Sequence, residues 1–70
     1  MEIDNYMLKE FLVWYKDHYG RDKAKKELLA ISMAGHFHIH VRQTKQLIER
    51  CITHGYVKCS RNEVEIKIEG

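Results

Sequence analysis

Three histidines alternate with other residues near the middle of the 70-residue chain, as His36, His38 and His40. Histidine is a common ligand of zinc and copper. A spacing of two brings three imidazoles to one side only in a strand, whereas we expect this stretch to be a helix end followed by a turn. No Cys-x-x-Cys or His-Glu-x-x-His pattern accompanies it. We therefore predict no metal and assign these histidines structural or phosphate-facing roles.

The sequence shows no pattern for catalysis. No nucleophile with a neighbouring base, no paired carboxylates and no glycine-rich phosphate loop is visible. A chain this short also has little room for a pocket that encloses a substrate. We therefore predict that the protein is not an enzyme and needs no cofactor.

Residues 41–54 carry side chains that suit nucleic acid. Spacings of three and four place one set on a common face of a helix that stops at Gly55, namely Val41, Thr44, Leu47, Ile48, Cys51 and Ile52. The start of the opposite face carries arginine, lysine and glutamine, which reach both base edges and phosphates. A preceding helix closes at Phe37 and a connector spans residues 38–40, so the pattern is typical of a helix-turn-helix whose second helix enters the major groove.

Two stretches after this helix, residues 56–60 and 63–68, alternate apolar and polar residues as half-buried strands do. Arg61-Asn62 is the expected two-residue connection. That turn sets one register with three facing pairs, which are Cys59 with Val64, Val57 with Ile66, and Lys58 with Glu65. The first two pairs face the core and the third faces solvent. Because one register makes both faces consistent, we predict a β-hairpin.

The helix, the sequence Gly55-Tyr56-Val57 and the hairpin resemble a winged-helix (winged helix-turn-helix) DNA-binding domain, the type found in many bacterial, archaeal and phage regulators. The resemblance covers about the last two thirds of the chain. It implies one α+β domain over residues 1–70, with three helices followed by a two-stranded wing. It also implies sequence-specific binding of double-stranded DNA, in transcription regulation or in replication.

On this hypothesis the contacts with DNA fall into three groups. The major-groove group is Arg42, Gln43, Lys45 and Gln46, the phosphate group is Arg50, Lys23, Lys25 and Lys26, and the hairpin turn Arg61-Asn62 touches the neighbouring backbone or minor groove. For the three lysines near position 25, the alternative is a solvated face. Positive charge favours the DNA reading, because seven basic and three acidic side chains fall in residues 21–50, against two and four in residues 1–20 and three of each in residues 51–70.

The first helix is expected from about residue 4 to residue 19. Asp4 is its predicted cap and Gly20 its stop, and Ile3 and Leu8 are placed as a hydrophobic staple. Its wide apolar surface has two interpretations. Either Phe11, Leu12 and Trp14 form the core under the other helices, or the part around Tyr6, Tyr15 and Tyr19 packs on a second subunit. We predict a homodimer through this helix.

The second helix is expected from about residue 22 to residue 37, with Asp22 as its cap. Its predicted inward line is Ala24, Leu28, Ile31 and Gly35. The third helix spans about residues 41–54. Cys51 and Cys59 are read as small buried hydrophobes with reduced thiols, and a disulfide between them is the lesser alternative.

Composition sets the broad class of the protein. A hydrophobic fraction of 44% is in the globular range. Glu2 and Asp4 stand where a signal peptide needs basic residues, and no apolar run is long enough to cross a bilayer. We therefore expect a soluble, cytoplasmic protein with no membrane association.

A second functional class stays open, a winged-helix adaptor that binds a protein partner and has no affinity for DNA. Acidic residues favour it. Glu63 and Glu65 follow the hairpin turn, and Glu49 lies within the expected recognition face, where it would oppose phosphate.

Overall fold

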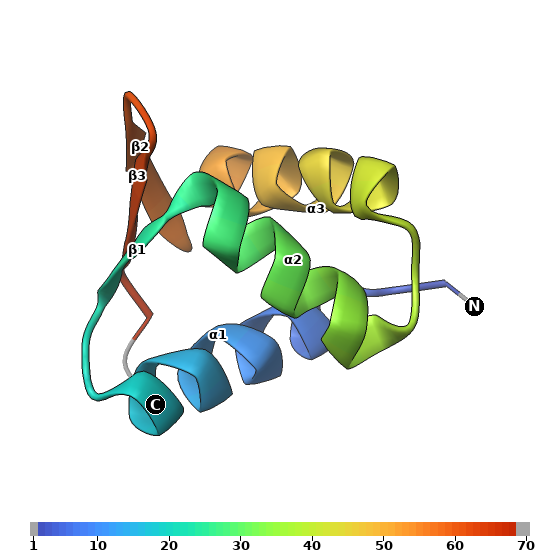
Figure 1. Cartoon of the computed structure of the whole chain (residues 1–70), viewed down its shortest axis with the longest axis horizontal. Helices are drawn as coiled ribbons and strands as arrows, with labels where there is room; N and C mark the ends of the chain where they lie inside the picture. The colour runs from blue at the N-terminus through green and yellow to red at the C-terminus, as the bar shows by residue number, and fades with distance from the viewer. Residues whose placement is uncertain (1, 69–70) are drawn as a thin grey trace.

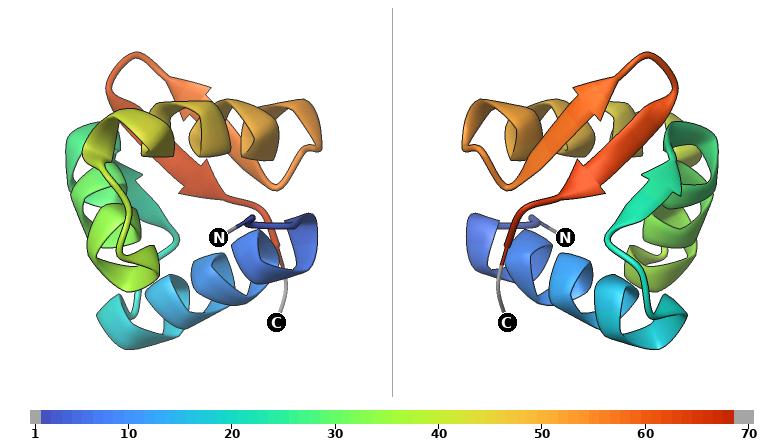
Figure 2. Two further views of the ribbon diagram at one scale, coloured as in Figure 1. Left: turned by 90° about the vertical axis from the view of Figure 1, so that its right-hand side faces the viewer. Right: turned by 90° about the vertical axis from the view of Figure 1, so that its left-hand side faces the viewer.

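In a computed structural model, which describes residues 2–68, the chain folds into a small α+β domain of three helices and a three-stranded antiparallel sheet. The elements in order are α1 (Asn5–Tyr19), β1 (Lys23–Lys25), α2 (Lys26–Phe37), α3 (Val41–Thr53), β2 (Val57–Ser60) and β3 (Glu63–Ile66). α1 and α3 form opposite sides of the molecule, α2 connects them along a third side, and the sheet closes the fourth (Figures 1 and 2). None of the helices described is long and apolar enough to span a bilayer.

Both predicted ends of α1 are confirmed. The side chain of Asp4 accepts a hydrogen bond from the backbone N–H of Met7 at 2.9 Å, which satisfies one of the free donors at a helix start. Gly20 follows the helix in the left-handed conformation, with φ of 66°. Ile3 and Leu8 are both buried, as the predicted staple requires.

Trp14 lies at the edge of the core, and its predicted place beside Phe11 and Leu12 inside the core is wrong. The buried stripe of α1 contains Leu8, Phe11, Leu12 and Tyr15. Trp14 falls to one side of that stripe and is 41% exposed. Its ring lies 5.0 Å from that of His18 and 5.3 Å from that of His36. The indole therefore packs against two imidazole rings and is partly exposed to solvent.

The stretch 23–25 was expected to be helical, and the structure corrects this. It forms strand β1, which pairs with β3, so the sheet has three strands in the order β1-β3-β2 where a two-stranded hairpin was expected. The carbonyl of Asp22 accepts from the N–H of Ile66 at 2.6 Å, and the N–H of Lys26 donates to the carbonyl of Asn62 at 2.7 Å. Asp22 therefore does not cap α2. The free edge of β3 offers these backbone groups partners that a longer helix could not give.

The hairpin itself has the predicted register. Val57 pairs with Ile66, Lys58 with Glu65 and Cys59 with Val64. Arg61 and Asn62 form the turn, and Arg61 has a positive φ of 56°. The alternation of side chains therefore decided the pairing correctly.

The predicted inward line of α2 is wrong, because a different face of the helix is buried and Ala24 lies in β1. The buried residues are Leu29, Ala30, Met33 and Phe37, whereas Leu28 and Ile31 are 56% and 63% exposed. Both lines are apolar and both have helical spacing, so periodicity does not choose between them. The packing of α2 on α1, α3 and the sheet makes the choice.

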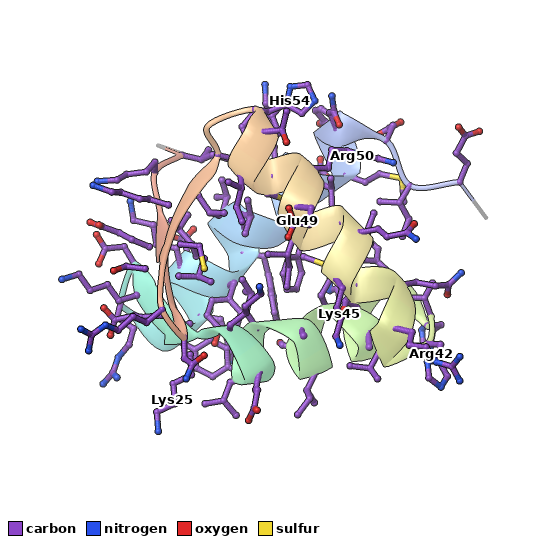
Figure 3. The ribbon with its side chains drawn as sticks, turned by 90° about the horizontal axis from the view of Figure 1, so that it is seen from above. Lys25, Arg42, Lys45, Glu49, Arg50 and His54 are labelled. Carbon is purple, nitrogen blue, oxygen red and sulfur yellow. The ribbon has the colours of Figure 1, made fainter. Side chains whose placement is uncertain are left out.

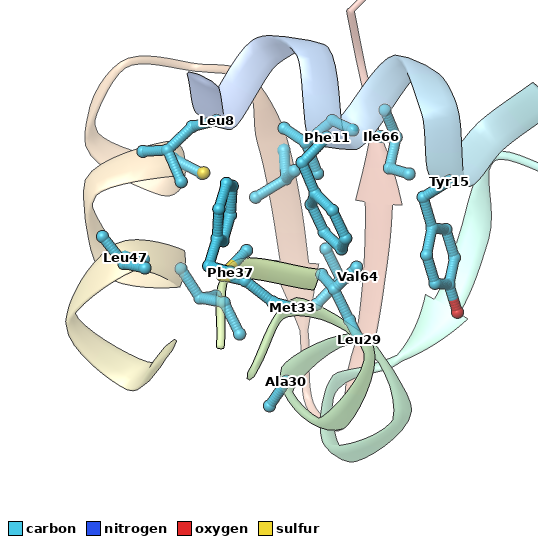
Figure 4. Packing of buried hydrophobic residues seen from close by; sticks show 14 of the residues in the cluster. Leu8, Phe11, Tyr15, Leu29, Ala30, Met33, Phe37, Leu47, Val64 and Ile66 are labelled. Carbon is cyan, nitrogen blue, oxygen red and sulfur yellow. The ribbon is translucent and has the colours of Figure 1, made fainter. Parts of the chain in front are cut away.

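The core collects side chains from all three helices and from the hairpin (Figure 4). From α3 it takes Thr44, Leu47, Ile48 and Cys51, as predicted, while Ile52 is half-buried. Val41 was expected on the same face, but it is 43% exposed because it begins the helix beyond the edge of the core. Cys51 is buried, Cys59 is half-buried, and both are free thiols.

Candidate nucleic-acid interface

The backbone of residues 38–40 makes a tight turn between α2 and α3. His38 adopts the left-handed conformation that ends α2, with φ of 57°, a position where glycine is common. The N–H of Ile39 donates to the carbonyl of Ala34 at 3.0 Å. A tight turn between two packed helices results, which is the arrangement expected of a helix-turn-helix.

His40 caps α3. Its Nδ1 accepts a hydrogen bond from the backbone N–H of Arg42 at 3.1 Å, and its own N–H donates to Oε1 of Gln43 at 3.2 Å. This reciprocal pair is a capping box in which an imidazole does what serine or threonine usually does. The histidines of the connector therefore have structural roles, and the amide of Gln43 is engaged in the cap.

The outward face of α3 carries a line of charged side chains. Arg42, Lys45 and Glu49 are exposed and stand three and four residues apart, so they follow one another along the helix. Figure 3 shows this line on the upper side of α3, pointing away from the body of the domain. Two cations precede one carboxylate, which makes the first half of the helix the more favourable for an anion.

Arg50 points elsewhere. Its Nη1 donates to the carbonyl of Ile3 at 2.6 Å, which attaches α3 to the segment before α1. A depression of about 140 Å³ beside this contact is lined by Gln43, Gln46 and Arg50 together with Ile3. The structure thus separates these three predicted contact residues from the line of Arg42 and Lys45.

The three lysines where β1 passes into α2 have different surroundings. Lys25 lies beside the hairpin turn, where it lines an open depression of about 600 Å³ with Glu27, Ser60, Arg61, Asn62 and Glu63. Lys23 stands across from Glu65, which forms an ion pair with Lys67 at 3.4 Å. Lys26 is half-buried and its N–H already donates to Asn62. Of these three lysines, only Lys25 lines the depression at the hairpin turn.

Seen from above, Arg42, Lys45 and Lys25 lie in one half of the molecule, with Lys25 and Arg42 at its two ends, while Arg50 and His54 lie in the other half (Figure 3). The pairing of β1 with β3 produces this arrangement, because it brings Lys25 to the end of the sheet next to Arg61. α3 and the hairpin turn carry guanidinium, ammonium and amide donors, which are groups that can bind phosphates and base edges.

A cluster at the C-terminal end of α3 was not predicted. The rings of His54 and Tyr56 stack at 5.4 Å, Nζ of Lys9 lies 5.1 Å from the centre of the Tyr56 ring, and Nε2 of His54 lies 3.3 Å from the amide nitrogen of Asn5. These contacts fix the start of α1 against the end of α3. Because Asn5 and His54 are 49 residues apart, no local pattern in the sequence could indicate them.

The helix that carries the basic line is firmly seated, since Thr44, Leu47, Ile48 and Cys51 bury its opposite face. Comparisons of the chain with protein-family models, with curated proteins and with solved structures found no match.

Proposed function

We propose that this chain is a winged helix-turn-helix domain that binds double-stranded DNA, with α3 in the major groove. One observation carries the proposal: Arg42 and Lys45 stand exposed at the start of a capped helix that follows a tight turn. An α-helix fits the major groove, where the base edges present a distinct pattern for each pair. The body of the domain lies behind this helix and leaves its outer face free.

The predicted contact residues take different roles on this proposal. Arg42 is placed to bind a base edge, and Lys45 reaches a base or a phosphate further along the groove. Gln46, by contrast, lines the depression beside Arg50. Lys25 and the turn Arg61-Asn62 contact the adjacent backbone or minor groove. Such binding is sequence-specific and serves a regulatory role in transcription or replication.

Fluorescence anisotropy with duplexes selected from a random pool tests the proposal. If Arg42 binds O6 and N7 of guanine, Arg42→Ala costs about 1–3 kcal/mol of binding free energy and relaxes the preference at one base position. Lys16→Ala is the control and should leave binding unchanged, because Lys16 belongs to α1, the helix that lies across the molecule from α3 (Figure 2). A folded Arg42→Ala protein that binds as the parent does would contradict the proposal.

The second candidate is an adaptor whose α3 face binds a protein. Glu49 interrupts the basic line, and Glu27 and Glu63 share the depression at the wing with Lys25 and Arg61. A salt titration separates the two candidates. DNA binding weakens steeply with salt because condensed counterions are released, whereas a protein interface of mixed charge releases no such atmosphere and should depend on salt far less steeply.

The homodimer through α1 stays a prediction, on a smaller surface than expected. Tyr15 is buried in the core, which leaves only Tyr6 and Tyr19 exposed from the predicted patch. A symmetric pair would place two α3 helices on two half-sites. Sedimentation of the free protein and of its complex with a selected duplex tests this, and a single copy in both would remove the dimer.

A further inference from the structure

A groove of about 460 Å³ lies between the end of α1, strand β1 and the outer face of α2. Leu28 and Ile31 form its apolar side on α2, with Tyr19 on α1 facing them across the groove. The charged side chains that line it are Arg21 and Lys23, and both are basic. α3 contributes no residue to this groove.

The outer face of α2 is apolar where a surface helix should be polar. The core face holds Leu29, Met33 and Phe37, yet Leu28 and Ile31 on the other side are more than half exposed. A helix that is apolar all round is normally buried. Large apolar side chains gathered in a hollow between three elements therefore indicate an interaction site.

We propose that this groove binds an acidic amphipathic helix of a partner protein. Apolar side chains spaced three and four apart along such a helix would lie on Leu28 and Ile31. Aspartate or glutamate beside them would meet Arg21 and Lys23, which supply the charge complementarity. The inference does not depend on DNA binding, because the groove and the basic line of α3 share no residue.

Charge and shape argue against other occupants. In a symmetric pair, a second copy would bring Arg21 and Lys23 toward cations of the same sign, which is unfavourable. A bilayer is flat and would not fill a hollow. Phosphate gains nothing from Leu28 or Ile31, which offer no hydrogen bond. Arg21 lines the groove together with Tyr15 and Tyr19, which supports the assignment. The same guanidinium opposes the rise in the pKa of the Tyr15 phenol that burial and Tyr19 cause.

Selection from a random phage-displayed peptide library on the immobilised full chain tests the proposal. We expect enriched peptides that combine apolar residues at helical spacing with aspartate or glutamate beside them. A synthetic copy of the leading peptide should bind Ile31→Asp at least tenfold more weakly than the parent. Val41→Asp is the matched control, because Val41 is also an exposed apolar residue but lies outside the groove.

A second pair of variants tests the contribution of charge to peptide binding. Arg21→Glu should weaken the peptide several-fold, with a smaller difference at high salt, whereas Arg42→Glu should leave the peptide unaffected. Ile31→Asp should still bind duplex DNA as the parent does, so failure of the groove and failure of the DNA proposal are distinguishable.

Four results would overturn the inference. They are a selection that enriches no acidic apolar peptide, peptides that bind Ile31→Asp as well as the parent, a dimer of the parent in sedimentation that Ile31→Asp abolishes, and binding to anionic phosphatidylserine vesicles that the same change abolishes. The third would assign the groove to a second copy and the fourth to a membrane surface.

Discussion

Nδ1 of His40 accepts the backbone N–H of Arg42 at 3.1 Å, so the residue that caps α3 directly orders the residue best placed to contact a partner. An imidazole can accept here only through an unprotonated nitrogen. The cap and the proposed recognition residue are therefore one structural unit, and a substitution at either should change the backbone position of the other.

Loss of this cap gives the first prediction. His40→Ala should lower the free energy of unfolding by about 1 kcal/mol, because the first turn of α3 loses an acceptor. It should also weaken DNA binding, since Arg42 would then stand on a frayed turn. His40→Asn, which restores a capping oxygen, is the control and should recover most of both losses. Equal stability of the parent and the alanine variant in urea unfolding would show that the cap contributes nothing.

The second prediction concerns the buried face of α3. Leu47→Ala and Ile48→Ala should each destabilise the domain by about 2–5 kcal/mol, because each leaves a cavity in the core. That is a large part of the roughly 5 kcal/mol that a small domain has. Val41→Ala, at an exposed position of the same helix, should change stability by less than about 0.5 kcal/mol. Thermal melts that do not distinguish the three variants would refute the orientation of α3.

Arg50 gives the third prediction, because its guanidinium donates to the carbonyl of Ile3. Arg50→Ala should lower stability by about 1 kcal/mol, less than a fully buried charged hydrogen bond, since the residue is exposed. The salt dependence of DNA binding should stay as in the parent. A slope reduced by about one unit with unchanged stability would instead restore the phosphate contact expected from the sequence.

Of the two lysines of β1, Lys25 is the one that lies beside the hairpin turn. On the DNA proposal, Lys25→Ala should weaken binding to all duplexes alike and flatten the salt slope by about one unit. Lys16→Ala on α1 should do neither. Anisotropy titrations at several salt concentrations measure both effects, and a loss confined to one duplex sequence would contradict a phosphate contact.

Burial raises the pKa of the Cys51 thiol to about 11, with the nearby Arg50 opposing the shift. A thiol in the unfolded chain ionises near pH 8.5, so deprotonation there favours unfolding. The stabilisation is complete below about pH 8.5 and is lost as the pH rises toward 11.

Urea unfolding at a series of alkaline pH values measures this loss. The parent should lose roughly 2–3 kcal/mol from this group over that range, whereas Cys51→Val should not. Cys59→Val keeps the buried thiol and should follow the parent. Parallel pH profiles for the parent and Cys51→Val would mean that the thiol is not protected by folding.

Local patterns in the sequence determined several features of this protein. The ends of α1 follow from Asp4 and Gly20, which satisfy helix termini without distant partners. The hairpin register follows from alternation, because a shift of one residue would put Val64 and Ile66 in water. The exposed position of Arg42 and Lys45 follows from the apolar spacing of α3.

The tertiary structure decided what depends on residues far apart in the chain. Residues 23–25 became β1 because β3, some 40 positions later, offered its free edge. Packing chose Leu29 over Leu28 for the core, although both lines of α2 are apolar, and so produced the groove. Arg50 donates to the carbonyl of Ile3, so its guanidinium lies away from Arg42 and Lys45. Local periodicity sets which residues share a face, but only contacts between elements decide which face is buried and which cations are left free.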